Sequence, residues 1–175
     1  AGGLARRFDT AVLSLRDEGE IGPRIQDLGV PVHALGMRRG LPGPAAIARL
    51  SRVVRSFQPD LLQGWMYHGN LAATLAARLA PGRPAMAWNI RQTLYDLQAE
   101  KFLTRQVIRA NRAFSARADA VIYNSRLSRS QHEALGFAAS RGRVVPNGFD
   151  LKRLRPDPAT GNAVRRELSL SRGCP

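Results

Sequence analysis

The sequence predicts an α/β protein built on a mostly parallel sheet with helices on both faces. Short apolar runs alternate with longer segments whose apolar residues recur at helical spacing, almost throughout the 175 residues. Such alternation is typical of parallel strands joined by helical crossovers. Polar residues also follow several of the apolar runs directly. Because open α/β sheets bind ligands at the carboxyl ends of their strands, this edge is where we expect a site.

The expected strands are short apolar runs bounded by polar or turn-forming residues. The second is set between Pro31 and Gly36, and the fifth ends where Asn124 begins a polar stretch. Their lengths fit buried strands rather than helices. The six runs are Thr10–Leu15, Val32–Leu35, Leu61–Trp65, Ala85–Ile90, Ala120–Tyr123 and Val144–Val145.

The expected helices lie between these strands and carry apolar residues on one face. Gly29 can cap the first of them and Pro44 suits the first turn of the second. Four of the predicted helices are Ile21–Leu28, Asn70–Ala80, Ser125–Leu135 and Ala163–Leu168. Another helix follows Pro44 and has Ile47, Leu50, Val54 and Phe57 on its apolar face. A long helix ends at about Ser115 and has Leu103, Val107, Ala110 and Phe114 on its buried side.

The chain is strongly basic, with 27 Lys and Arg against 13 Asp and Glu and a net charge of +14. Lys101 and Lys152 are its only lysines. Three interpretations stay open: a solvated arginine-rich surface, a surface for anionic phospholipid or diphosphate ligands, or nucleic-acid binding. No helix-turn-helix, zinc pattern or aromatic ribonucleoprotein signature supports the last of these.

Other features limit the class of protein. No run of 18 apolar residues predicts a membrane-spanning helix. Cys174 is the single cysteine, so a disulfide framework is excluded and a cytoplasmic location is expected. The first residue is Ala rather than Met, which suggests a piece of a longer protein. Neither a Walker loop nor a GxGxxG motif is present, and the three histidines have no metal-ligand spacing, so no metal is expected.

His68 is the first candidate site residue because it follows the third expected strand, in GWMYHGN. An imidazole at that edge could act as a base or bind hydroxyl or phosphate oxygens. The alternative is a histidine that is hydrogen-bonded within a loop.

The ends of the fourth and fifth strands supply further candidates. Asn89, Arg91 and Gln92 close the fourth, and Arg91 could make a bidentate contact with phosphate or carboxylate. Asn124 and Ser125 follow the fifth, where Ser125 can cap a helix or the same helix end can hold an anion.

The last strand is followed by Asn147 and Gly148, which predict a turn with positive φ or a hinge towards a second domain. Aromatic side chains also gather near the strand ends. They either pack in the core or stack on a sugar ring, and they are Trp65, Tyr67, Trp88 and Tyr95.

The motifs occur in an order that resembles family 4 of the glycosyltransferases, over residues from about 8 to 170. The segments that carry the resemblance are LGVPVHALGM, FQPDLLQGWMYHGNLAA, AWNIRQTLYDL, ADAVIYNS, QHEALGF and VVPNGFD.

The resemblance implies one Rossmann-like half of a GT-B enzyme, the half that holds the acceptor, with the first strand of that half missing. Residues 1–150 would form this domain, and residues 151–175 would be a linker and the start of an absent donor-binding domain. Family motifs often carry a sugar-contacting histidine where Gln92 stands, so that role is not transferred.

The resemblance also implies an activity for the intact parent protein. It would transfer a sugar from a nucleotide-diphosphate sugar to a lipid-linked or saccharide acceptor, with retention and without a metal. This chain alone would bind no cofactor and would be inactive, and the parent would lie in the cytoplasm or at the inner face of the plasma membrane. A different hypothesis is a non-catalytic basic α/β module that binds anionic surfaces or nucleic acid. A third is an incomplete domain that folds poorly.

Overall fold

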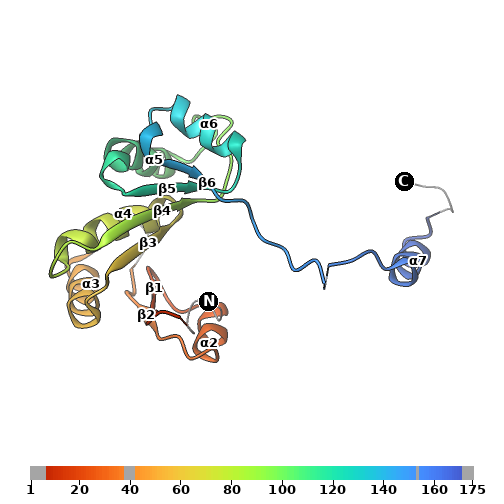
Figure 1. Ribbon diagram of the computed structural model, residues 1–175, viewed down its shortest axis with the longest axis horizontal. Helices are drawn as coiled ribbons and strands as arrows, with labels where there is room; N and C mark the ends of the chain where they lie inside the picture. The colour runs from red at the N-terminus through yellow and green to blue at the C-terminus, as the bar shows by residue number, and fades with distance from the viewer. Residues whose placement is uncertain (1–6, 38–41, 153, 171–175) are drawn as a thin grey trace.

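The computed structural model describes residues 7–37, 42–152 and 154–170 and has an α/β architecture (Figure 1). Six strands alternate with helices in chain order. The elements are β1 (Val12–Ser14), α2 (Ile21–Gln26), β2 (Val32–Ala34), α3 (Pro44–Phe57), β3 (Leu61–Trp65), α4 (Met66–Leu79), β4 (Ala85–Ile90), α5 (Phe102–Phe114), the 3-10 turn Ser115–Arg117, β5 (Ala120–Tyr123), α6 (Arg126–Ala134), the 3-10 turn Ala139–Arg141, β6 (Gly142–Val144) and α7 (Pro158–Glu167).

The strands form two parallel sheets rather than one continuous sheet. β3, β4, β5 and β6 lie side by side in that order, and all three pairings are parallel. β1 pairs in parallel with β2, with Val12 opposite Val32. All carboxyl ends of the larger sheet therefore meet at one edge, as the sequence predicts.

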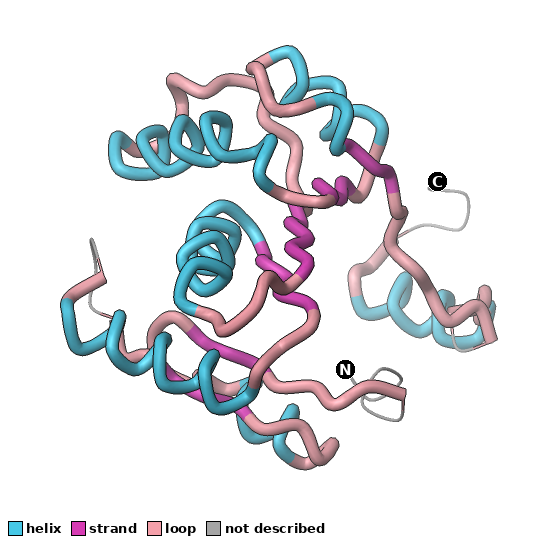
Figure 2. The backbone as a smooth tube through the Cα atoms, turned by 60° about the vertical axis from the view of Figure 1, so that its left-hand side comes forward, coloured by secondary structure: helices cyan, strands magenta, loops and turns pink. Residues whose placement is uncertain are grey.

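Helices α3, α4 and α5 lie on the same side of the strands, with α4 in the middle (Figure 2). α4 packs against β3 and β4 and touches α3 and α5 on its two flanks. On the opposite face of the larger sheet, Leu61 and Trp65 of β3 are more than half exposed.

Two hydrophobic clusters stabilise these layers. The first joins the larger sheet to α4 and α5, and its fully buried members include Trp88, Ile90 and Ile108. The second joins α3 to α4 and to the end of β2, with Leu35 and Leu50 at its centre. Burial of apolar side chains is the main favourable contribution to the free energy of folding.

The junction between β3 and α4 has no connecting residue. α4 begins at Met66, which has a left-handed φ of 59°, directly after Trp65. A Cβ on Gly64 would lie 2.6 Å from the Asn70 Cα, so only glycine allows this approach. The tight turn places the first residues of α4 at the carboxyl edge of the sheet.

Several boundaries differ from the sequence-based expectations. α4 starts at Met66 rather than Asn70, and β6 covers Gly142–Val144 rather than Val144–Val145. Leu103 was expected on the buried side of α5 but is 66% exposed, because the buried residues of this helix are Ile108 and Asn111.

The last helix also starts earlier than predicted. The expected segment was Ala163–Leu168, whereas α7 begins at Pro158 because the Asp157 carboxylate caps its first amides. α7 has no buried residue, and Figure 1 shows it apart from the sheets at the end of an extended segment.

Candidate functional site at the carboxyl edge of the sheet

The site is built around residues 91–94, which follow β4 and are called the site loop below. Two side chains of α6 hold its backbone. The Ser128 hydroxyl donates to the Gln92 carbonyl at 2.6 Å, and the Leu94 amide donates to the Gln131 side-chain oxygen at 2.9 Å. Since Ser128 and Gln131 are one helical turn apart, both project from the same face of α6.

Arg91 is the most heavily contacted residue of the loop. Its amide donates to the Met66 sulfur at 3.3 Å, and its carbonyl accepts from the Asn124 amide group at 3.2 Å. Its guanidinium lies 5.5 Å from the centre of the Trp65 ring and donates to the Asn147 side-chain oxygen. Residues that follow β3, β4, β5 and β6 are thus joined through one arginine.

This arrangement defines what the edge can bind. A guanidinium offers five donors in a planar fork that suits phosphate or carboxylate oxygens, and it can also donate to sugar hydroxyls. The Trp65 ring is more than half exposed and offers an apolar face beside that cation. A cation beside an aromatic ring matches an anionic or polyhydroxylated ligand.

Gln92 is oriented by a chain of polar contacts that leads into the core. Its amide nitrogen lies 3.4 Å from the Tyr67 hydroxyl, and that hydroxyl lies 2.7 Å from Nε2 of His132. Nδ1 of His132 lies 2.7 Å from the Ser128 carbonyl. A carbonyl can only accept, so Nδ1 carries the proton and Nε2 accepts from Tyr67.

The ionisable groups in this series of polar contacts are buried, and burial shifts their pKa values. His132 is fully buried, and desolvation lowers its pKa although the Ser128 carbonyl opposes the shift. Desolvation likewise raises the pKa of Tyr67 to about 12 and raises the pKa of Tyr123. Near neutral pH the network is uncharged and acts as a fixed frame for Gln92.

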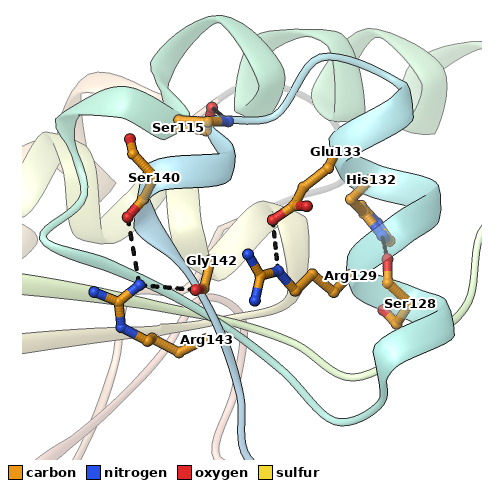
Figure 3. Close-up of polar contacts among 9 residues, drawn as sticks. Ser115, Ser128, Arg129, His132, Glu133, Ser140, Gly142 and Arg143 are labelled. Carbon is orange, nitrogen blue, oxygen red and sulfur yellow. Dashed lines mark hydrogen bonds and ion pairs between the residues drawn. The ribbon is translucent and has the colours of Figure 1, made fainter.

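α6 itself is fixed at its first turn. The Ser125 hydroxyl accepts from the Ser128 amide at 3.0 Å, which confirms Ser125 as a helix cap. Figure 3 shows Ser128 and His132 one turn apart on α6, and the ion pair between Arg129 and Glu133 at 2.7 Å. The helix that carries the loop contacts is therefore well anchored.

Several of the predicted site residues lie outside the site loop. Asn89 is buried in the sheet, where its amide lies 3.5 Å from the Gly64 carbonyl. His68 was expected in a loop but lies inside α4, where it lines an apolar groove instead of contacting the site loop. Trp88 is fully buried in the core, whereas Tyr95 is 79% exposed.

The Asn147 and Gly148 pair does not form the expected turn. Neither residue has a positive φ, and the segment after β6 runs without turn structure. Asn147 instead accepts from Arg91, so the contact holds this segment extended against the site loop.

Sequence reasoning missed Ser128, Gln131 and His132 as parts of the site, and it predicted for Tyr67 either core packing or stacking on a sugar ring. The available signal was the spacing of Ser128, Gln131 and His132, which places three polar side chains on one face of the expected helix. The side-chain oxygen of Asn124 is buried without a hydrogen-bond partner among the described residues. It is an acceptor that a ligand hydroxyl or a water could satisfy.

The described ranges contain neither a cluster of metal-binding side chains nor a membrane-spanning helix. Within residues 7–37, 42–152 and 154–170, no group of three or more His, Cys, Asp or Glu side chains could bind a metal ion. No helix in the same ranges is long and apolar enough to span a membrane.

The fold is that of a Rossmann-like half of a GT-B protein. A crystal structure of Anabaena Alr3699/HepE in complex with UDP and glucose superposes with a TM-score of 0.74 at 20% identity, covering 97% of this chain and 44% of that one. The same protein in complex with UDP-glucose gives 0.70 at 20% identity, with the same coverage. This chain therefore spans less than half the length of that protein, and no curated protein matches it in sequence.

The family is established by the sequence match. Residues 1–148 match the glycosyl transferase 4-like domain, which is most of the chain. The chain belongs to this glycosyltransferase family, as the ordered motifs predict.

Proposed function

We propose that this chain is the acceptor-side domain of a glycosyltransferase. The intact protein transfers a sugar from a nucleotide-diphosphate sugar to a lipid-linked or saccharide acceptor, and it retains the configuration at the anomeric carbon. The donor is bound by a second domain outside residues 1–150, and the Asn147–Gly148 segment leads towards it. The enzyme works in the cytoplasm, in polysaccharide or glycolipid synthesis at the membrane surface.

The observation that carries this proposal is the Arg91 cluster. Four strand ends converge on one arginine, which leaves a cation, an exposed ring and the Gln92 side chain at a single edge. A saccharide acceptor suits this set, because its hydroxyls can accept from Arg91 while a pyranose face stacks on Trp65. The family membership and the likeness to a protein crystallised with UDP-glucose support a nucleotide-sugar donor.

The chemistry assigned to these residues is binding and orientation. Arg91 and Gln92 would hold the acceptor so that its nucleophilic hydroxyl faces the donor across the interdomain cleft. Holding two reactants in attack geometry supplies much of the rate of such a transfer. Tyr67 and His132 contribute by fixing Gln92, and neither contacts the reacting atoms.

The test is transfer of radiolabelled sugar from UDP-glucose and other nucleotide sugars into endogenous lipid and saccharide acceptors by the full-length parent. Arg91→Gln should lower kcat/KM for the acceptor roughly tenfold to a hundredfold, while the control Arg83→Gln, at the opposite edge of the sheet, should leave it unchanged. His68→Ala tests whether that residue contributes. Equal rates for Arg91→Gln and wild type would overturn the assigned acceptor role.

The isolated 175-residue chain provides a second test. It should turn over no nucleotide sugar, because the proposal places the donor site in another domain. Sugar release by the purified chain would contradict this division of labour.

A further inference from the structure

The chain that leaves the sheet after β6 is tied to the domain as far as Asn147. The amide of Val145 donates to the Tyr123 carbonyl at 2.9 Å, which continues the parallel ladder one residue beyond β6. Pro146 follows, and its ring fixes φ at about −65°, so little rotational freedom separates this ladder from Asn147. The Asn147 side-chain oxygen then accepts from the Arg91 guanidinium. Asn147 is therefore held both through the chain and through its side chain.

The residues that follow Asn147 make hydrogen bonds within their own segment. The Asp150 carboxylate accepts from the Lys152 amide at 3.0 Å, and the Asp150 carbonyl accepts from the Leu154 amide at 2.8 Å. Phe149, between these bonds and Asn147, is largely exposed. The contact between Asn147 and Arg91 therefore lies where the chain parts from the sheet.

Arg91 combines a fixed backbone with an adjustable side chain. Its amide and carbonyl are bonded to Met66 and Asn124, so its Cα position is set by the ends of β3 and β5. Its guanidinium is placed by the Trp65 ring, 5.5 Å away, and by the Asn147 oxygen. Contact with a ring constrains the orientation of the planar fork less than a hydrogen bond does. Asn147 therefore sets the direction in which the remaining donors of Arg91 point.

The two kinds of contact that Arg91 can make favour each other. An arginine side chain gives up much rotamer freedom when it is immobilised. A ligand oxygen held by Arg91 immobilises the same side chain that donates to Asn147, so each contact lowers the entropic cost of the other. A guanidinium has five donors, so both contacts can be made together. By thermodynamic linkage this coupling is reciprocal.

We propose that Asn147 is a positioning residue for Arg91 and couples ligand binding at the site loop to the segment that leaves the sheet. The Asn147 oxygen orients the guanidinium for the acceptor. An acceptor held by Arg91 in turn strengthens the hydrogen bond to Asn147 and orders the residues that follow it. This inference rests on the proposed function, in which Arg91 holds the acceptor, and deepens it by joining the acceptor site to the path towards the second domain.

The positioning role is tested in the full-length parent by measuring transfer over a range of acceptor concentrations. Asn147→Leu keeps the side-chain volume but removes the oxygen, and it should raise KM for the acceptor roughly threefold to tenfold with little change in kcat. Asn147→Asp keeps an oxygen at the same place and should hold KM within about twofold of wild type. In the Arg91→Gln background, Asn147→Leu should have no further effect, because Asn147 acts through Arg91.

The link to the departing segment is tested without sugar transfer, by electron paramagnetic resonance of a nitroxide label at Phe149→Cys in the 175-residue chain with Cys174→Ser. The label should be more mobile in Asn147→Leu and in Arg91→Gln, with a correlation time shorter by roughly twofold or more. Asn162→Leu makes the same change at an exposed position of α7 and should leave the spectrum unchanged. Circular dichroism checks that each variant is folded.

The same label in the full-length parent, with other cysteines replaced, tests the coupling directly. Addition of acceptor should slow the label in the parent with Asn147 and leave it unchanged in Asn147→Leu.

The outcomes separate this inference from the function on which it rests. An unchanged acceptor KM in Asn147→Leu, or an equal loss in this variant with and without Arg91, would overturn the positioning role. Unchanged label mobility in Asn147→Leu, while Arg91→Gln still impairs transfer, would overturn the coupling and leave the proposed function standing. Normal transfer by Arg91→Gln would overturn the acceptor role of Arg91 and the inference with it.

Discussion

The core beneath α5 and α6 contains buried hydrogen-bonding side chains, whereas the core around α3 is formed by apolar side chains. Four polar residues in the first are at most 1% exposed, and they are Asn111, Ser115, Ser128 and His132. The buried members of the second are Leu35, Ala46, Leu50, Val54 and Ala76. The two cores share α4 but stabilise the chain in different ways.

The difference explains where the site lies. Hydrogen bonds have preferred directions, so Ser128 orients the Gln92 carbonyl and His132 orients the Tyr67 hydroxyl. Apolar contacts are non-directional, and the α3 side is left with an open groove lined by Leu50. One half of the molecule therefore holds polar side chains in fixed positions at the candidate site, and the other offers an adaptable apolar surface.

We expect the largest loss of stability from substitutions that create a cavity in one of the two cores. Ile108→Ala should lower the free energy of unfolding by about 3–4 kcal/mol, because Ile108 is fully buried and its neighbours are held in place. Leu50→Ala should cost about 2 kcal/mol, because the groove beside it lets the site relax. Urea unfolding measures both, and a larger loss for Leu50→Ala would reverse the comparison.

We expect the next largest loss of stability from breaking the buried hydrogen bond between Tyr67 and His132. His132→Leu leaves the Tyr67 hydroxyl without its acceptor and should cost about 2 kcal/mol. Tyr67→Phe removes the other partner and should cost a similar amount or slightly less. If the two act through one contact, the double variant should lose clearly less than the sum of the single losses. Strict additivity in urea unfolding would argue against the contact.

The lowered pKa of His132 makes stability depend on pH. Below the ordinary value of 6.5 the unfolded chain takes up a proton that folded His132 does not, so the free energy of unfolding falls as the pH falls. The loss approaches about 1.4 kcal/mol per pH unit until the folded pKa is reached. Urea midpoints at pH 7.5 and pH 5 should therefore differ less in His132→Leu than in wild type, with His33→Gln at an exposed position as the control.

The smallest effect concerns the cap of α6. Ser125→Ala removes the acceptor for the Ser128 amide and should cost about 1 kcal/mol. Ser130→Ala, at an exposed position within the same helix, should be neutral or slightly stabilising because alanine is the better helix former. Equal thermal midpoints for the two variants would show that the cap does not contribute.

The sequence predicts the sheet well because its strands have strong local signals. β3, β4 and β5 fall on the expected residues, since each is a continuous apolar run bounded by turn-forming or polar residues. The start of α4 is missed because Met66 adopts a left-handed φ, which few non-glycine residues do, so no loop is needed. This error also moved His68 from the expected loop into the helix.

The site is predicted in part. Arg91 and Gln92 follow from their position after a strand, and Ser125 follows from capping preference. The contacts that fix Arg91 and Gln92 join residues 25 or more positions apart, and Ser128 and Gln92 are 36 apart. Such pairings depend on how α6 packs across β5 and β6, which local periodicity does not encode.

Gly64 carries a consequence for comparing related sequences. A side chain there would enter the backbone of Asn70, so no substitution leaves both β3 and the first turn of α4 in place. The position therefore serves as a fixed reference when relatives are aligned. Any relative with a larger residue at this point must separate the strand from the helix by a loop, which would move Tyr67 and the first-turn residues away from the carboxyl edge of the sheet.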